Sequence, residues 1–553
     1  MNVAWGDLAN TIWDKFVGPV ASLGNNTEAI WDRQTTCFWD IAWVIGEDPG
    51  DGSDARWLDR RKNWREHREP DEAGDLCTLM GRYQELSGYA RLGGKEKQEV
   101  FWRQIRKHKY EHVDGPRSVG DLNLRESERL CAIALIKRLF PLVAKDVLGW
   151  WPGGDNLSTI NWPSTSYVAA VPWLKKVAEN AALESVISDY EDECEKKLKS
   201  YKGETETRLF GLPEDDFFKL DGHLLHEDGV AAWCRENGVE DRREKLLSAL
   251  KRVQKASGGR PSEFYAILKM DGDRIGEKIG ETETANKVKD GLAIFTAKVK
   301  DYFDPAKGNP ADGVLVYAGG DDVLAFLPVN SAIEAAYDLR ALYSDAFEKA
   351  DATDLATFTM SAAIIFTHYK NPLRQVLEEA EHYLDRVAKD GNGRDSLAIA
   401  VMKPGGIAFD WVSCWEKTVA PGRRLIEVAD RVGGEGAEYS TGLLYNIRER
   451  YKPIFAPDDR EGGMAEGFSD MIGPVLIAEY KKQPGRAKTP RDEAEAAVEP
   501  LVDIGQPLRR ADNGTISRLA GYDFDGPLVA RFLAVEGRRH GPKPAGSVAE
   551  DGA

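Results

Sequence analysis

Cysteine pairs, long apolar runs and leader patterns are all missing from this 553-residue sequence. Its six cysteines are scattered and none belongs to a CxxC pair, which argues against a disulfide framework and is typical of a protein from a reducing compartment. No apolar run approaches the roughly 20 residues that a membrane span requires, and no basic-then-apolar signal opens the chain. We therefore predict a globular, cytoplasmic protein that makes no contact with a membrane.

Positive charge is also in short supply. The chain has 92 Asp and Glu against 74 Lys and Arg, a net charge of −18, so its overall field repels polyanions. Any nucleic acid must therefore meet a local basic surface, a metal site or a groove shared with a more basic partner. The run RQIRKHKYEH (103–112) is the best local candidate for a surface that faces RNA, and a solvated helix face is the alternative.

The length predicts several domains, and the pattern of elements divides the chain into three. Residues 1–258 read as packed helices and charged loops, with a short buried strand at 165–173. The glycines and the proline of KASGGRPS mark a linker, so we place a boundary at residue 259. Residues 413–553 read as a helical domain without strands, with a polar insertion at 481–495 and a disordered tail after 539.

Strand and helix patterns alternate regularly between residues 259 and 412. The predicted strands are 263–271, a hairpin over 312–328, 358–366 and 396–402, and the helices between them include 331–350 and 372–389. The order β-α-ββ-α-β predicts an α+β fold with a ferredoxin-like antiparallel sheet and its helices on one face. This is the palm architecture of polymerases and nucleotide cyclases.

Two acidic clusters stand at the ends of these strands. Asp271 and Asp273 follow the first strand, and Asp321 and Asp322 follow Gly319-Gly320 at the hairpin tip. If the strands are adjacent, the four carboxylates meet, and such hard oxygen ligands suit two Mg²⁺ or Mn²⁺ ions that activate a ribose hydroxyl for attack at phosphorus. Glycine permits a positive φ in the turn and a close approach of a triphosphate. A plain hairpin turn, where Gly and Asp are also favoured, is the alternative.

The chain resembles the large subunit of type III-B CRISPR effector complexes, the GGDD "CRISPR polymerases", over FYAILKMDGDRIGEKIG (264–280), VYAGGDDVLAFLP (316–328), residues 361–389 and GRDSLAIAVMKPGG (393–406). The resemblance implies an RNA-activated enzyme that joins ATP into cyclic oligoadenylates for antiviral defence. Its partners would be guide RNA, target RNA and the other subunits of the complex. It also implies that residues 1–258 are a partial first palm-like region with a shortened N-terminus, which leaves the platform for a second ATP in question.

The same resemblance assigns the metal ligands and the catalytic residues. Asp271 and Asp321 would be the chief ligands of the two ions, and the carbonyl of Gly272 would add another. Asp322 and Asp273 would support them. Asp271, Asp321 and Asp322 are thus the expected catalytic residues.

Further residues would contact the nucleotide, namely Gly272, Asp273, Gly319 and Gly320. Lys389 and Arg394 flank the turn after the last palm helix and are candidates for binding the triphosphate, with a cation at a helix end as the alternative. Ser361 and His368 could edge the adenine pocket, and a structural role is the alternative for the histidine.

The sequence also departs from the family pattern. Many members carry an HD nuclease domain, but no His-Asp dipeptide occurs here, so we expect no such DNase activity. The family's zinc module uses paired CxxC units, whereas the motifs at Cys77 and Cys131 keep only the first cysteine. We expect no bound zinc, although His67, His108 or His112 could complete a site.

Two other functions remain as alternatives to the enzyme. One is a catalytically silent scaffold that binds guide RNA, target RNA and partner subunits. The other is a free-standing diguanylate cyclase, which we rank last because such a cyclase lacks a large helical C-terminal domain and the family phrases.

Overall fold

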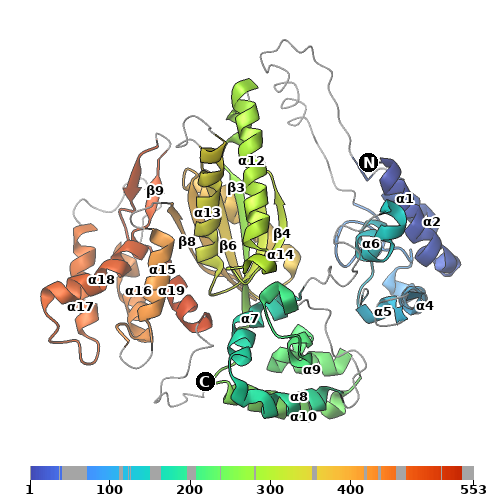
Figure 1. Ribbon diagram of the computed structural model, residues 1–553, viewed down its shortest axis with the longest axis horizontal. Coiled ribbons are helices and arrows are strands. Elements are labelled where there is room, and N and C mark those ends of the chain that lie inside the picture. Colours follow the sequence, from blue (N-terminus) through green and yellow to red (C-terminus); the bar gives the residue numbers. More distant parts are fainter. Residues whose placement is uncertain are drawn as a thin grey trace. The chain divides into compact units, whose positions relative to one another are not determined.

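The computed structural model describes residues 2–36, 38–39, 71–110, 116–122, 124, 126–149, 163–195, 207–236, 238–278, 282–350, 358–415, 420–433, 437–455, 469–511 and 514–537. The chain divides into two compact units, Met1–Trp162 and Pro163–Ala553 (Figure 1). The predicted boundaries at 259 and 413 fall inside the second unit and stay predictions. Among the residues in these ranges, no helix combines the length and the apolar character needed to cross a bilayer.

Helices make up most of the described part of the first unit. These are α1 (Asn2–Ile12), α2 (Thr27–Thr36), α4 (Arg91–Lys107), α5 (Val119–Leu122) and α6 (Ala132–Leu148). They enclose a core that includes Trp31, Phe101 and Trp102. Two short strands, β1 (Lys109–Tyr110) and β2 (Arg117–Ser118), pair antiparallel beside them.

A six-stranded sheet in the order β4-β5-β3-β6-β7-β8 lies at the centre of the second unit. Its strands are β3 (Phe264–Gly272), β4 (Val314–Gly319), β5 (Asp322–Pro328), β6 (Met360–His368), β7 (Ser396–Lys403) and β8 (Gly406–Cys414). The strands β3 to β6 pair antiparallel and are connected through α12 (Thr282–Tyr302) and α13 (Ala332–Lys349), which confirms the predicted ferredoxin-like palm. The sheet does not close at residue 402, because β8 extends it beyond β7.

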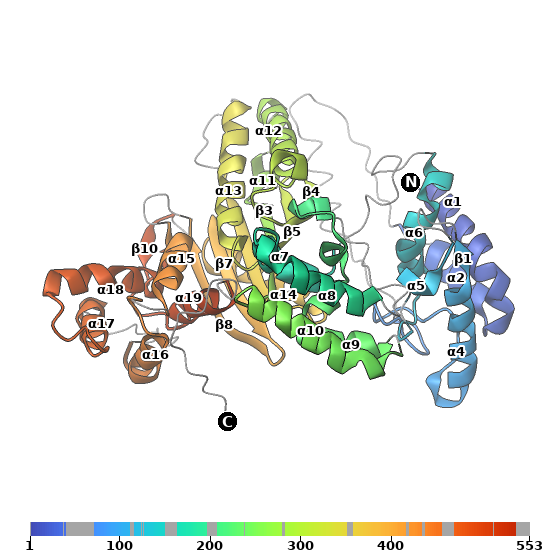
Figure 2. The same cartoon turned by 60° about the horizontal axis from the view of Figure 1, so that its bottom comes forward.

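Helices cover both faces of this sheet, whereas the prediction placed them on one. Ala266, Leu268 and Met270 of β3 pack with α12 and α13, which run side by side (Figures 1 and 2). Tyr265 and Ile267 face the other way, toward α7 (Thr165–Ala178) and α14 (Leu373–His382). The reason is the parallel pair β6–β7, which needs a crossover connection, and α14 with the following π-helical segment η11 (Tyr383–Gly391) provides it.

The predicted strand at 165–173 is wrong, because these residues form the first part of α7. The Ser164 side chain caps this helix by accepting a hydrogen bond from the Tyr167 N–H at 3.2 Å. The segment from Tyr167 to Val171 is entirely buried, and a short apolar run of this kind does not distinguish a buried helix from a buried strand. The chain continues through α8 (Glu184–Glu195), α9 (Glu227–Glu236) and α10 (Arg243–Ala256).

The described residues of the C-terminal region are mainly helical, as predicted. Its helices are α15 (Pro421–Arg431), α16 (Thr441–Phe455), α17 (Ile472–Lys481), α18 (Arg491–Gly505) and α19 (Asp525–Glu536). The expectation that strands end near residue 413 is wrong, because β9 (Leu508–Arg510) and β10 (Ile516–Arg518) form a hairpin. This hairpin lies against β8 and thereby connects the C-terminal region to the palm. The tail after 539 lies outside the described residues.

Candidate active site

Three carboxylates converge where β3 ends and the β4–β5 hairpin turns. Asp271 precedes the last residue of β3, and Asp321 and Asp322 lie at the hairpin, whose second strand pairs with β3. One carboxylate oxygen from each side chain lies within 4.8 Å of the others. Asp271 and Asp321 are half-buried, and Asp322 is exposed. Of the four aspartates singled out in the sequence, the structure thus brings three together, and we call these three the acidic cluster.

Two glycines permit this close approach. A Cβ on Gly272 would lie 2.6 Å from the Tyr343 hydroxyl and 2.8 Å from the Cβ of Asp321, so a side chain there would push β3 away from the hairpin. Gly320 is the first residue of the hairpin turn and has a φ of +69°, a conformation that other residues rarely adopt. Gly319 pairs with Asp322 across the same turn.

The carboxylates of the acidic cluster repel one another. Although the Asp322 residue is exposed overall, partial burial of its carboxyl group raises its pKa to about 6, and the hydrogen bond and charge of Asp271 and the charge of Asp321 add to the effect. The Lys389 ammonium offsets part of this charge, because it contacts the Asp271 carboxylate and lies 3.2 Å from Asp385 Oδ1. Burial by itself would lower the pKa of Lys389, but these two carboxylates outweigh it and raise the pKa. Lys389 therefore stays protonated beside the cluster.

The arrangement fits a hard divalent cation. Every donor in the cluster is a carboxylate oxygen, the three lie within reach of one ion, and their combined charge exceeds that of Lys389. Mg²⁺ and Mn²⁺ prefer such oxygens and complete their shells with water and phosphate. Asp271, Asp321 and Asp322 are thus the residues that could hold metal, and their roles as ligands stay predictions.

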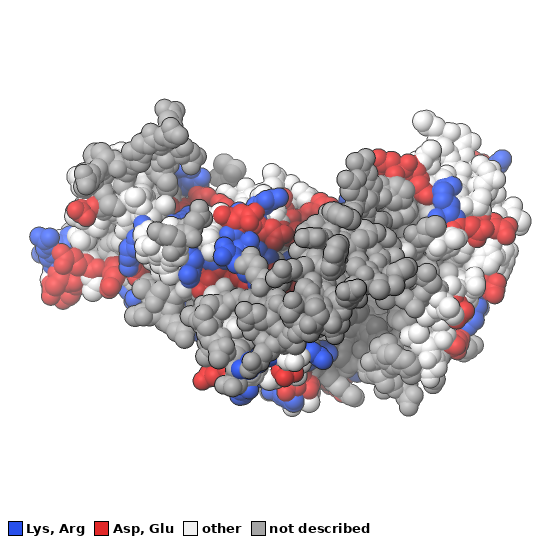
Figure 3. All heavy atoms as spheres, turned by 90° about the horizontal axis from the view of Figure 1, so that it is seen from above, with Lys and Arg blue, Asp and Glu red and all other residues white. Residues whose placement is uncertain are grey.

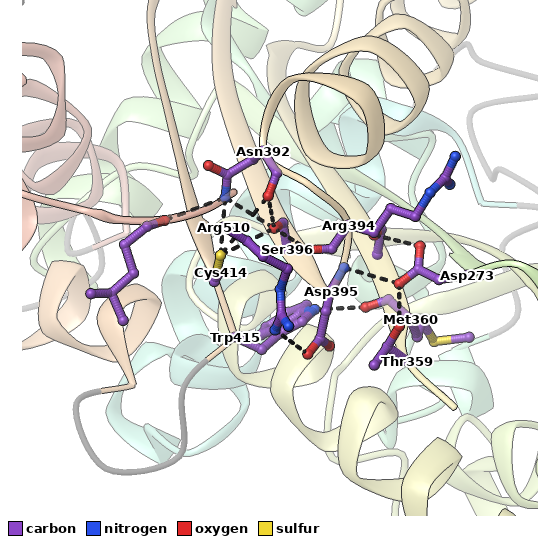
Figure 4. Close-up of polar contacts among 12 residues, drawn as sticks. Asp273, Thr359, Met360, Asn392, Arg394, Asp395, Ser396, Cys414, Trp415 and Arg510 are labelled. Carbon is purple, nitrogen blue, oxygen red and sulfur yellow. Dashed lines mark hydrogen bonds and ion pairs between the residues drawn. The ribbon is translucent and has the colours of Figure 1, made fainter. Parts of the chain in front are cut away.

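Asp273 lies apart from the acidic cluster, in a buried polar network (Figure 4). It is 2% exposed and accepts hydrogen bonds from Ser361 Oγ (2.8 Å), Thr359 Oγ1 (2.8 Å) and the Asp395 N–H (3.0 Å). Burial raises the pKa of Asp273 and outweighs these hydrogen bonds, which act in the opposite direction. Ser361 and Asp273 thus hydrogen-bond to each other in this structure. Their roles in nucleotide binding stay predictions.

Asp395 anchors the other side of this network. Its carboxylate accepts hydrogen bonds from Arg340 Nη2 of α13 at 2.8 Å and from Arg510 Nη2 of β9 at 2.9 Å. The C-terminal hairpin thus reaches a residue whose backbone holds Asp273. The sequence contained no signal for this role of Arg340 and Arg510, because arginines at such positions usually face solvent.

The turn that carries Asp395 has a strained backbone. Gly393, Arg394 and Asp395 have φ angles of 71°, 71° and 46°, a region that glycine alone visits freely. The Arg394 N–H donates to the Lys389 carbonyl oxygen at 3.0 Å, and its guanidinium lies 3.9 Å from Asp390, pointing away from the network (Figure 4). Lys389 and Arg394 flank the turn as predicted, and Lys389 is the one that contacts the acidic cluster.

His368 lies far along the sheet from the acidic cluster. It pairs with Phe264 at the start of β3, whereas Ser361 pairs with Asp271 near the end. At about 3.3 Å per residue, the two ends of this strand pair are roughly 20 Å apart. The imidazole stacks on Tyr369, with ring centroids 4.8 Å apart. His368 and Ser361 therefore do not edge one pocket, and the alternative structural role fits the histidine.

Cys77 and Cys131, the first residues of two incomplete CxxC motifs, meet in the first unit. The Met80 N–H donates to Cys77 Sγ at 3.4 Å, and Cys131 Sγ lies 3.6 Å from Met80 Sδ. Hydrogen bonding to Cys131 lowers the pKa of Cys77 to about 6. Met80 thus occupies the place of a second cysteine. His108 packs against an aromatic ring, and the other two candidate histidines lie outside the described residues.

Comparison with known proteins finds similarity over the region that carries this site. Residues 264–398 match the model of the second palm domain of Cas10/Cmr2. The CRISPR system Cmr subunit Cmr2 of Pyrococcus furiosus is 29% identical over 330 residues, which cover 53% of this chain and 34% of that protein. The chain thus matches only part of the length of this relative.

Two solved structures share the fold. A cryo-EM structure of the type III-B Cmr-beta in its apo state matches with a TM-score of 0.51 at 14% identity, over 97% of this chain and 68% of that chain. The Cmr-beta structure bound to cognate target RNA matches with a TM-score of 0.50 at 14% identity, over 87% of this chain and 59% of that chain. At this identity the likeness concerns the fold alone, and the match to the palm model concerns the same residues that carry the acidic cluster.

Proposed function

We propose, from the premise that this chain is a homologue of the Cas10/Cmr2 large subunit, that its palm is a divalent-metal-dependent nucleotidyltransferase. It joins ATP molecules through 3′–5′ links into cyclic oligoadenylate when target RNA pairs with guide RNA in a cytoplasmic type III CRISPR complex, as part of antiviral defence. The observation that carries this proposal is the meeting of Asp271, Asp321 and Asp322 within the matched palm region.

Each residue of the site takes a role that follows from its position. Asp271, Asp321 and Asp322 would hold the metal. The carbonyl of Gly272, the residue after Asp271, would be a further ligand. A bound divalent metal lowers the pKa of a ribose 3′-hydroxyl and neutralises phosphate charge. The 3′-oxygen of one ATP attacks the α-phosphorus of another, its proton passes to water, and pyrophosphate leaves as the bond to the α-phosphorus breaks.

Lys389 is the proposed partner of the triphosphate. Its ammonium contacts Asp271 in the structure, and its side chain is 12% exposed. Once the Asp271 carboxylate is engaged by another cation, the ammonium is free to pair with phosphate oxygens, which it binds as a point charge. In this proposal, the Lys389 ammonium pairs with Asp271 when no metal is bound and with the triphosphate when metal is bound.

RNA binding is proposed to be shared with partner subunits. Acidic and basic side chains lie intermingled over the described part of the face in Figure 3, without a broad basic field. Of the basic run at 103–112, residues 103–110 are described, and Arg103, Lys107 and Lys109 are exposed. Because the net charge is −18, these few cations need support from a more basic partner to hold RNA. The related Cmr-beta has been solved with cognate target RNA, which supports this arrangement.

A catalytically silent scaffold is the competing proposal. The contact between Lys389 and Asp271 favours it, because an ammonium already neutralises part of the acidic cluster without metal. An assay for cyclic oligoadenylate separates the two proposals. It contains the assembled complex, target RNA, labelled ATP, and Mg²⁺ or Mn²⁺.

Cyclic oligoadenylate that requires target RNA and disappears in Asp321→Asn/Asp322→Asn is the expected result. Asp301→Asn, which removes an exposed carboxylate paired with Lys307, is the matched control and should keep activity. Absence of product from the wild-type complex would contradict the enzyme and favour the scaffold. A product made from labelled GTP by the chain alone would instead establish the free-standing cyclase.

A further inference from the structure

The Tyr343 hydroxyl is a buried donor that the described residues leave without a partner. Tyr343 lies on α13 and is 0% exposed, and among the described residues no hydrogen-bond partner reaches its hydroxyl oxygen. Leaving a buried polar group unpaired costs about 1–3 kcal/mol. Such groups are rare in folded proteins and call for an explanation, one of which is an ion or water that completes the site.

The position of this hydroxyl points to the metal end of the palm. It lies against Gly272, where an added Cβ would be 2.6 Å from it and 2.8 Å from the Asp321 Cβ. The ring is held from behind by Phe295, at a centroid distance of 5.0 Å, and by Phe347 at 4.9 Å. These apolar contacts fix the ring, so its one polar atom is directed to the place where β3 meets the hairpin.

The chemistry of this hydroxyl makes it a donor. A phenol carries its proton at neutral pH, and what it can offer to this end of the palm is a hydrogen bond. A hydrogen bond from a neutral donor suits an oxygen that carries negative charge or is polarised by a cation.

We propose that Tyr343 is a positioning residue for the divalent metal, and that its hydroxyl donates a hydrogen bond to an oxygen of the shell around a metal held by Asp271 and Asp321. Mg²⁺ and Mn²⁺ keep several waters in protein sites, and side chains that hydrogen-bond to the inner shell tune the affinity of such sites. The proposal rests on the metal binding in the proposed function and not on nucleotide polymerisation.

The test compares two tyrosines in the full chain. Tyr343→Phe removes the hydroxyl and keeps the ring. Tyr265→Phe is the matched control, because Tyr265 is also 0% exposed and its hydroxyl likewise finds no partner among the described residues, but it lies near the start of β3 and on the opposite face of the sheet. Mn²⁺ affinity is measured by calorimetry, and thermal unfolding is followed with and without Mn²⁺.

We expect Tyr343→Phe to weaken Mn²⁺ binding by about 10-fold to 100-fold, as for other changes behind the inner shell of a metal. Its stability without metal should not fall, because no hydrogen bond is lost. Tyr265→Phe should bind Mn²⁺ like the wild type. Unchanged affinity in Tyr343→Phe, or equal weakening in both variants, would overturn the proposal.

A third variant separates this inference from the proposed function. Asp321→Asn/Asp322→Asn should abolish Mn²⁺ binding. If it does so while Tyr343→Phe binds normally, the positioning role fails and the metal site stands. If the wild type binds no Mn²⁺, or the double variant binds as well as the wild type, the metal site and the role of Tyr343 fail together.

Discussion

Single residues at the end of β3 show how closely cations and carboxylates are balanced. Asp271 contacts Lys389 on one side and converges with Asp321 and Asp322 on the other. Because carboxylates in proximity repel one another, each change of charge at this point should alter both stability and metal affinity. Two predictions follow from this balance at the residue scale.

Lys389→Met should have opposite effects with and without metal. Without metal, the variant loses its cation beside the cluster, and the free energy of unfolding should fall by about 1–3 kcal/mol, because Asp271 is left without its charged partner. With Mn²⁺, the metal no longer competes with an ammonium, so calorimetry should show tighter binding than in the wild type. ATP affinity in the presence of metal should decrease. Weaker Mn²⁺ binding in the variant would contradict this account.

Asp322 should make metal binding depend on pH. Its pKa is raised from 3.8 to about 6 in the folded protein, so its contribution to stability is complete below the unfolded value of 3.8 and is lost as pH rises through about 6. Metal requires the ionised carboxylate, so Mn²⁺ affinity should rise through the same window. Titrations between about pH 5 and pH 7 measure this slope. Asp322→Asn should reduce it, and a flat profile in the wild type would rule out the assignment.

At the scale of elements, the contact between β3 and the β4–β5 hairpin depends on the absence of a side chain. Gly272→Ala would place a Cβ 2.6 Å from the Tyr343 hydroxyl and 2.8 Å from the Asp321 Cβ. We expect a loss of about 1–3 kcal/mol in the free energy of unfolding from overpacking, together with weaker Mn²⁺ binding. Gly276→Ala is the control, because nothing lies within 4 Å of the added Cβ. Equal behaviour of the two variants in chemical denaturation would refute the close approach.

A buried carboxylate strengthens the contact between the β9–β10 hairpin and the palm. Asp395, whose side chain is 12% exposed, pairs with Arg340 and Arg510. Asp395→Asn leaves two guanidinium groups beside each other without their counter-ion, and breaking a buried ion pair costs about 3–5 kcal/mol. The exposed pair in Asp301→Asn should cost less than about 1 kcal/mol. Urea unfolding measures both, and a small effect of Asp395→Asn would show that the hairpin packs independently of this network.

At the scale of the whole molecule, the palm needs the elements around it. Residues 163–553 form one compact unit that holds the acidic cluster and the helices on both faces of the sheet. Expressed alone, this unit should unfold cooperatively and bind Mn²⁺ like the full chain. Residues 264–398 alone should neither unfold cooperatively nor bind Mn²⁺ like the full chain, because loss of α7 exposes Tyr265 and Ile267 to solvent. Thermal melts followed by circular dichroism test this prediction. A cooperative melt of residues 264–398 alone would contradict it.

Prediction succeeded where the signal is local. The order of strands and helices from β3 to β6 follows from periodicity and turn chemistry, and this order places the hairpin beside β3. The meeting of Asp271 with Asp321 and Asp322 was therefore predictable. Asp273 was not separable from them by pattern, because its direction depends on Ser361 and Thr359.

The amino-acid sequence by itself determined the order of strands and helices in the palm and the strand ends at which its acidic residues gather, because periodicity and turn chemistry are local. Only the tertiary structure decided that α7 is a helix, that a second face of the sheet is covered, that Tyr343 lies against Gly272, and that Arg510 reaches Asp395. These features depend on packing between distant segments, and such contacts leave no periodic trace in a sequence.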